Sequence, residues 1–131
     1  MLRTTLHLLL LSATFFLLAT CGKTEHLQGR ALYTEHCANC HMDDGRGLRQ
    51  LIPPLAGADY LQERPAAVVA GIRHGMNGPL VVNGTTYNYP MPGNADLTEF
   101  QIVNIVNYIN QAWGNDYGRI TVAQTREWLD D

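Results

Sequence analysis

The five residues Cys37-Ala38-Asn39-Cys40-His41 constrain this chain more than any other stretch. They read C-x-x-C-H, the pattern by which haem c is attached to protein. Each thiol can bond one vinyl group of the porphyrin, and the histidine that follows can be the proximal ligand of the iron. The motif therefore predicts one covalently bound haem, held by Cys37, Cys40 and His41.

Two other interpretations of the cysteine pair are a structural zinc half-site and a redox-active dithiol. A tetrahedral zinc site needs four ligands, whereas outside the motif the chain has only Cys21 and scattered histidines. A redox dithiol is typical of a βαβ pattern, and no such pattern surrounds these residues. The motif thus favours haem over both alternatives.

The composition is that of one small domain. A chain of 131 residues is too short for two domains. Its formal net charge is −3, so nucleic acid is not an expected partner. The 12 glycines and 6 prolines indicate many loops between modest helices. A bound haem would give such a chain a large apolar body to wrap, which offsets its limited core.

Residues 1–20 have the pattern of an export signal. Arg3 gives a positive start, and an apolar run with few polar residues follows at 6–18. Such a run suits a secretory signal peptide and is short for a membrane-spanning helix. An uncleaved membrane anchor is the alternative. Export agrees with the haem motif, because haem c is attached outside the cytoplasm in bacteria.

Cys21 ends a stretch, L-A-T-C, that resembles a bacterial lipobox, in which the cysteine receives the lipid. Thr20 departs from the Gly, Ala or Ser usual before the cysteine. The chain has 3 cysteines and the haem motif uses two, so Cys21 would otherwise be an unpaired thiol in an exported protein. We therefore expect residues 21–28 to form a lipidated cysteine and short tether, the alternative being a soluble form cleaved nearby. The haem domain then spans 29–131.

Two helices near the ends of this domain are expected to cross. The first, residues 29–36, leads into the motif. The last, residues 98–113, opens with the capping box T-E-F-Q, carries an apolar stripe and is stopped by a glycine. We expect Tyr33 and Tyr108 to meet near Gly29, whose missing side chain would allow a close crossing. Surface variation is the alternative explanation of this glycine.

Between them the sequence predicts a helix, a hairpin and, after them, a short tail helix. Residues 59–65 lead into the helix, with the proline in its first turn, and Gly75 ends it. Asn83-Gly84 between apolar and β-branched residues is a strong hairpin signal. The tail, residues 121–128, is expected to be one more short helix.

The stretch Ile52–Gly57 reads I-P-P-L-A-G. A ligating imidazole normally donates its other N–H to a backbone carbonyl, which fixes its orientation. The carbonyl of Pro53 is the candidate acceptor, with Leu55 packed on the haem. A plain rigid loop is the alternative interpretation.

Met91 and Met76 are the candidates for a second axial ligand. Met91 stands between two prolines, which stiffen the backbone and lower the entropy cost of fixing the thioether. It also precedes the last helix, which can brace it. Met76 follows a helix end, where a core or haem-rim residue is the simpler interpretation. Met91 is therefore the favoured ligand, with His26 and His36 as remote alternatives.

Taken together, these motifs resemble a class I c-type cytochrome of the bacterial single-haem kind over about two thirds of the chain. The shared pattern is C-x-x-C-H at 37–41, P-x-L-x-G at 53–57, M-P at 91–92 and an aromatic at Tyr108. The resemblance implies an all-α, small cytochrome c fold. Three to five helices would wrap one covalently bound haem, with a possible short β-hairpin before the distal ligand.

With His41 and Met91 as axial ligands no position is open for substrate, so electron transfer is expected and catalysis is not. The chain would pass single electrons at the periplasmic face of a bacterial membrane. Expected partners are a terminal oxidase, nitrite reductase, dehydrogenase or quinol-oxidising complex. The alternatives are a fixed haem subunit of a larger respiratory oxidoreductase and a gas-binding sensor with a labile Met91.

Overall fold

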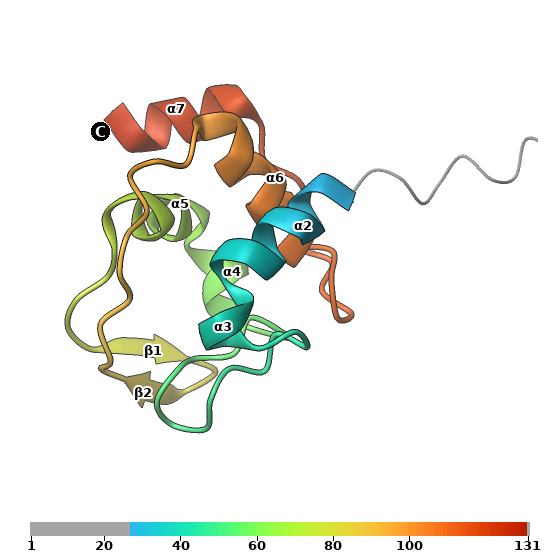
Figure 1. Cartoon of the computed structure of the whole chain (residues 1–131). Helices are drawn as coiled ribbons and strands as arrows, with labels where there is room; N and C mark the ends of the chain where they lie inside the picture. Colours follow the sequence, from blue (N-terminus) through green and yellow to red (C-terminus); the bar gives the residue numbers. More distant parts are fainter. Residues whose placement is uncertain (1–26, 131) are drawn as a thin grey trace, which may run out of the picture.

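Residues 27–130 are described by the computed structural model of this chain. The predicted signal peptide, residues 1–20, and the predicted lipidation site Cys21 lie outside them. Within the described residues the fold is mostly helical, as predicted, and a two-stranded sheet lies away from the C-terminal helix (Figure 1). The elements are α2 (Leu27–His36), α3 (Ala38–His41), α4 (Asp59–Glu63), α5 (Pro65–His74), β1 (Leu80–Val82), β2 (Thr85–Tyr87), α6 (Glu99–Ile109) and α7 (Val122–Asp130).

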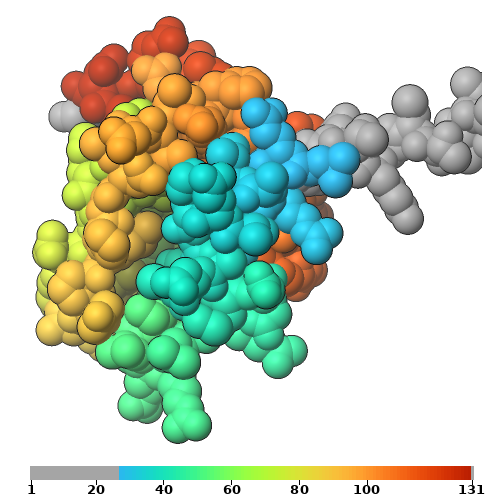
Figure 2. Space-filling model, viewed as in Figure 1, coloured from blue at the N-terminus to red at the C-terminus, as the bar shows by residue number. Residues whose placement is uncertain are grey.

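Helices α2 and α6 cross near the start of α2, which confirms the predicted crossing. A methyl group on Gly29 would overlap the carbonyl oxygen of Asn104 and lie 2.8 Å from the Cβ of Tyr108. Glycine is therefore needed for this close approach. The ring centroids of Tyr33 and Tyr108 are 5.4 Å apart, so the predicted aromatic contact is also present. In the space-filling view the blue residues of α2 lie beside orange residues of the α6 region (Figure 2).

The start of α6 follows the prediction, whereas its end does not. The Thr98 hydroxyl accepts from the Gln101 N–H, and the Gln101 side chain accepts from the Thr98 N–H, which completes the capping box. The helix ends at Ile109, before the predicted end at Trp113 and Gly114. The Asn115 side chain donates to the Ile109 carbonyl at 2.7 Å, so this carbonyl has a hydrogen-bond partner although the helix ends early.

The middle of the chain forms two short helices, α4 and α5. Arg64 separates them with φ −136° and ψ 54°, outside the helical region. A residue that precedes proline is disfavoured in the helical region, which explains the break. Pro65 occupies the first turn of α5, as predicted, and Gly75 follows its last residue.

The predicted hairpin is present as β1 and β2, paired antiparallel with Val82 opposite Thr85. Asn83 and Gly84 both have positive φ, 51° and 73°, as a type I′ turn requires. The turn is fastened to the start of α4, because the backbone N–H groups of Asp59 and Asn83 each donate to the other's side-chain oxygen, at 3.0 and 2.8 Å.

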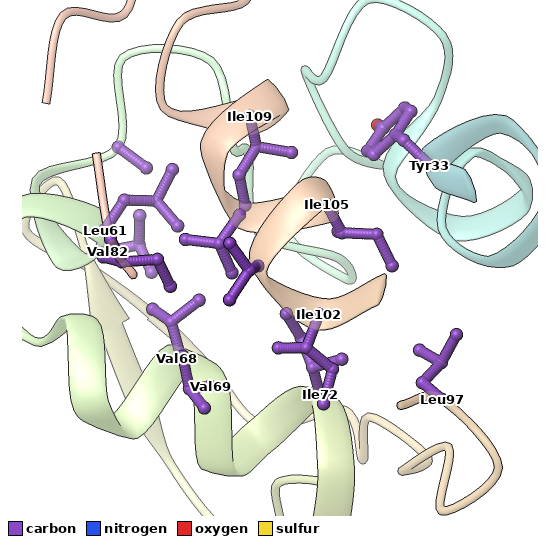
Figure 3. Close-up of a cluster of buried hydrophobic side chains, with 14 of the residues drawn as sticks. Tyr33, Leu61, Val68, Val69, Ile72, Val82, Leu97, Ile102, Ile105 and Ile109 are labelled. Carbon is purple, nitrogen blue, oxygen red and sulfur yellow. The ribbon is translucent and has the colours of Figure 1, made fainter. Parts of the chain in front are cut away.

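The core lies between α5 and α6, and α7 packs on both (Figure 3). Its largest fully buried aliphatic side chains are Val69, Ile102, Ile105 and Val106. The predicted tail helix is confirmed as α7, which has its own capping pair in Thr121 and Gln124. Among the helices of residues 27–130, none combines the length and the apolar character that crossing a membrane would require.

Candidate haem-binding site

The two thiols of the motif lie on either side of the start of α3, because Cys37 is the residue between α2 and α3 and Cys40 lies within α3. The Cys37 N–H donates to the Tyr33 carbonyl at 2.8 Å, and the His41 N–H donates to the Cys37 carbonyl at 2.9 Å. Cys37 is half-buried and Cys40 is exposed. Burial and the neighbouring Cys40 raise the pKa of the Cys37 thiol to about 11. A redox-active dithiol needs a lowered thiol pKa, so this environment does not favour the dithiol alternative.

His41 is buried at the end of α3. Its ring nitrogen Nδ1 lies 3.1 Å from the carbonyl oxygen of Pro53, the predicted partner. Because a carbonyl can only accept, Nδ1 carries the proton and Nε2 keeps its lone pair. Burial lowers the pKa of His41, and the hydrogen bond to Pro53 opposes that shift. The neutral imidazole favoured by burial is the form that binds iron.

The loop that carries Pro53 is held by backbone contacts on one side and by Asn115 on the other. The Leu55 N–H donates to the Gly45 carbonyl at 2.7 Å. The Asn115 side chain donates to the Leu55 carbonyl at 3.0 Å and accepts from the Gly57 N–H at 2.7 Å. Leu55 packs against the core rather than lining the cavity beside His41. Its contact with a haem therefore stays a prediction.

Three aromatic rings pack behind the motif. The centroids of Tyr33 and Trp113 are 5.1 Å apart, and those of Tyr108 and Trp113 are 5.6 Å apart. The Tyr33 hydroxyl donates to the Met42 carbonyl at 2.6 Å, and the Trp113 indole N–H donates to the Asp43 carbonyl at 3.0 Å. Burial raises the pKa of Tyr33, so its hydroxyl stays a donor. The cluster thus fixes the backbone directly after His41.

Met91 lines the same cavity as His41, although it comes from a separate segment. The two backbone hydrogen bonds between Met91 and Met76, 2.9 and 3.0 Å long, form an isolated antiparallel bridge. The structure therefore places both candidate methionines at the cavity, side by side in the backbone. The Met76 side chain packs against Gly71 of α5, and Met91 is the one held between prolines.

The cavity has an empty volume of about 790 Å³, its open mouth included. Cys40, His41, Pro53 and Met91 all contribute to its lining. The rest of the lining is mostly apolar and includes Ile52, Leu61, Leu80, Val82 and Tyr87. A flat apolar group with a cationic metal fits such a donor set, because the lining offers a thiol, an imidazole nitrogen and a thioether.

Zinc is not supported by the described part of the chain. Within residues 27–130 no group of three or more His, Cys, Asp or Glu side chains could hold a metal ion. Cys21, the remaining cysteine, lies outside those residues. His36 and His74 lie at the ends of α2 and α5 and do not line the cavity with His41.

Two of the contacts that shape the site were not predicted. The sequence indicates no role for Asn115. It predicts Trp113 inside a helix, whereas α6 ends at Ile109 and Trp113 has a φ of 54°. Both act on residues far away in sequence, so a local pattern carried no signal for either. The Asp43–Trp113 and Gly57–Asn115 pairs are separated by 70 and 58 residues.

Comparisons with known proteins agree with this site. Residues 27–113 match the family described as Cytochrome c. The chain is 33% identical over 91 residues to cytochrome c-552 of Thermus thermophilus, covering 66% of this chain and 69% of that protein. The family match ends at Trp113, so Asn115 and α7 lie beyond it.

Two further relatives are subunits of dehydrogenases. The chain is 36% identical over 112 residues to the cytochrome c subunit of a quinone alcohol dehydrogenase from Gluconacetobacter polyoxogenes, covering 83% of this chain and 24% of that protein. It is 30% identical over 114 residues to the fructose dehydrogenase cytochrome subunit of Gluconobacter japonicus, covering 79% and 22%. The chain thus spans about a quarter of the length of these subunits.

Proposed function

We propose that this chain, which belongs to the cytochrome c family, is a single-haem protein that transfers one electron at a time. The observation that carries the proposal is the cavity shared by His41 and Met91. His41 and Met91 line one mostly apolar cavity. Of the two thiols that would bond the porphyrin, Cys40 lies on the same short helix as His41 and Cys37 directly precedes that helix. This donor set is that of a haem with both axial positions filled.

The residues have distinct roles in this proposal. Cys37 and Cys40 would bond the porphyrin, and His41, oriented by the Pro53 carbonyl at 3.1 Å, would be the proximal ligand. Met91 would be the distal ligand. The bound haem supplies one-electron redox chemistry between Fe(II) and Fe(III).

The surrounding chain keeps that site dry and nearly rigid. The mostly apolar lining excludes water and lowers the local dielectric, which favours the less charged reduced state. The hydrogen bond to His41 and the bridge to Met91 keep both ligand-bearing segments in place. With His41 and Met91 as its ligands the iron would have no open axial position, so we propose an electron carrier without catalytic activity of its own.

The partners and the location are also proposals. We infer that the chain is exported and held at the periplasmic face of a membrane by a lipid on Cys21. A dehydrogenase is the favoured class of partner, because two relatives are named as cytochrome subunits of such enzymes. A terminal oxidase, nitrite reductase or quinol-oxidising complex remains an alternative. The same relatives support the second candidate function, a fixed subunit of a larger oxidoreductase.

The optical spectrum of the reduced protein, before and after carbon monoxide is added, tests the proposed ligand set. An unchanged low-spin spectrum is expected, since both axial positions are filled. A prompt change to a carbonyl complex would show an open or labile distal position and would favour the gas-binding alternative.

Fractionation tests the anchor and the partner separately. Native protein is expected in the membrane fraction and Cys21→Ser in the soluble fraction, with the same haem spectrum. A Cys21→Ser protein that stays membrane-bound would contradict lipidation as the cause. Co-purification of Cys21→Ser in fixed ratio with large subunits would favour the fixed-subunit function over a free carrier.

A further inference from the structure

The backbone around Met91 is fastened to the end of α5. The Met76 N–H donates to the Met91 carbonyl at 2.9 Å, and the Met91 N–H donates to the Met76 carbonyl at 3.0 Å. Three residues later, the Asn94 N–H donates to the Ile72 carbonyl at 2.8 Å. These contacts tie the loop to α5 and to the residues that directly follow it, so α5 rather than α6 braces Met91.

Arg73 adds a side-chain contact to the same junction. Its guanidinium donates to the Ala95 carbonyl at 2.8 Å. The contact lies beyond Asn94 and so extends the attachment toward the start of α6. The loop from Met91 to Ala95 is thereby bound at its start to Met76, which follows α5, and toward its end to Ile72 and Arg73 of α5.

The loop comes closest to α5 at Gly93. A methyl group placed on Gly93 would lie 2.5 Å from the Gly75 nitrogen, 2.5 Å from the His74 carbonyl carbon and 2.7 Å from the Arg73 oxygen. Likewise, a methyl group on Gly75 would lie 2.7 Å from the Met91 oxygen and 2.8 Å from the Gly93 nitrogen. Each glycine therefore makes room for the backbone of the other segment.

These backbone neighbours cannot give way cheaply. The Gly75 N–H donates to the Gly71 carbonyl at 2.8 Å, which fixes the residue as the cap of α5. Buried helix residues beside it, such as Ile72, belong to the core. A side chain on Gly93 would therefore displace the loop rather than the helix, and the displaced loop includes Met91, two residues earlier.

We propose that Gly93, through its contact with the Arg73–Gly75 end of α5, is a positioning residue that keeps the Met91 thioether at the iron. The inference rests on the proposed function, in which Met91 is the distal ligand. His41 and Pro53 make no part of this junction, so proximal binding is expected to survive when the junction fails.

Imidazole binding to the ferric holoprotein tests the proposal, because added imidazole competes with the thioether for the iron. Gly93→Ala adds bulk, and its φ is not in the left-handed region, so the clash is its main effect. We expect Gly93→Ala to bind imidazole at least about tenfold more tightly than the native protein does, because overpacking displaces the loop. Gly84→Ala is the control for backbone strain without a clash, because Gly84 has a φ of +73° and no atom lies within 4 Å of an added methyl group.

Two further variants keep the outcomes distinct. Met91→Ala is expected to bind imidazole more tightly than every other variant; if it binds like the native protein, the proposed ligand set fails. If Met91→Ala binds tightly but Gly93→Ala matches Gly84→Ala, the positioning role alone is overturned. If Gly93→Ala yields no folded holoprotein, Arg73→Ala decides, since it removes the Ala95 contact without adding bulk. Arg73→Ala should then tighten imidazole binding about two- to fivefold, and native-like binding would overturn the proposal.

Discussion

His41 and Met91 lie in one cavity but are held there by different kinds of contact. His41 is part of a four-residue helix inside the motif, and its orienting partner Pro53 is 12 residues away. Met91 lies in a loop, and its position depends on backbone contacts with the end of α5 and with Met76. One ligand is thus placed by neighbouring sequence and the other by tertiary structure.

Because of this difference, the attachment of the porphyrin and the distal coordination of the iron depend on different parts of the chain. In the proposed site the proximal side would combine two covalent bonds to the porphyrin, a short helix and the hydrogen bond of His41 to Pro53, 12 residues away. We expect the covalent bonds to keep His41 near the iron when other parts of the fold loosen. The distal side has no covalent bond to the porphyrin and depends on several contacts, each worth about 1 kcal/mol. We therefore expect perturbations of the fold to release Met91 before His41.

The largest expected effect comes from His41→Ala. Removing the imidazole deletes the iron ligand inside the attachment motif, so we expect no detectable low-spin haem protein. Haem content per protein and the absorption spectrum provide the measurement. His36→Ala is the matched control and should give normal holoprotein. A low-spin spectrum in His41→Ala would contradict the proximal assignment.

Met91→Leu should have the next largest effect, and on coordination rather than attachment. Leucine keeps the approximate volume but offers no sulfur, so the haem should stay bound while the distal position opens. The reduced variant is expected to bind carbon monoxide, and its reduction potential should fall because the soft ligand is lost. Met42→Leu, next to the motif, should behave like the native protein. Loss of haem from Met91→Leu would show that the two sides are not separable.

Asn115→Ala tests whether the proximal side also depends on a distant contact. The change removes the hydrogen bonds to Leu55, Gly57 and Ile109, and it leaves the buried carbonyl of Ile109 without this partner. We expect the free energy of unfolding in urea to fall by about 2–3 kcal/mol. Asn104→Ala, which loses an exposed bond to its own helix, should change it by less than about 0.5 kcal/mol. Equal stability of the two variants would show that Asn115 does not stabilise the loop that carries Pro53.

The smallest effect is expected at the hairpin turn, on the distal side. Asn83→Gly keeps a residue that tolerates the φ of 51° but removes the side chain that accepts from the Asp59 N–H. We expect a loss of about 1 kcal/mol in the free energy of unfolding. Asn88→Gly, an exposed residue of the same region, should cost less. Thermal unfolding of the two holoproteins compares them, and equal midpoints would show that the hairpin is held in place without this contact.

Much of the fold could be predicted because its signals are local. The capping box at Thr98, the proline at the start of α5 and the Asn83-Gly84 turn each act on backbone groups a few residues away. The Pro53 carbonyl could be anticipated because a ligating imidazole needs an acceptor and a proline loop follows the motif closely. All of these predictions depend on short stretches of sequence.

The remainder depends on residues that are neighbours only in space. The end of α6 could not be predicted at Ile109, because the residue that satisfies its carbonyl, Asn115, lies beyond the turn. The fit of Gly93 against Gly75 could not be read from either residue, since each glycine by itself is compatible with an ordinary loop. The sequence therefore predicts Met91 for the distal side without the contacts that hold its backbone, and its role as a ligand stays a prediction.

The crossing of α2 and α6 has a consequence for the rate at which this chain folds. The contact of Gly29 with Asn104 and Tyr108 joins the first described helix to α6, so a long loop must close before the contact forms. Helical proteins fold fast when their contacts are local, and this contact is non-local. We expect the segment around His41 to be organised early and the meeting of α2 with α6 to limit the folding rate.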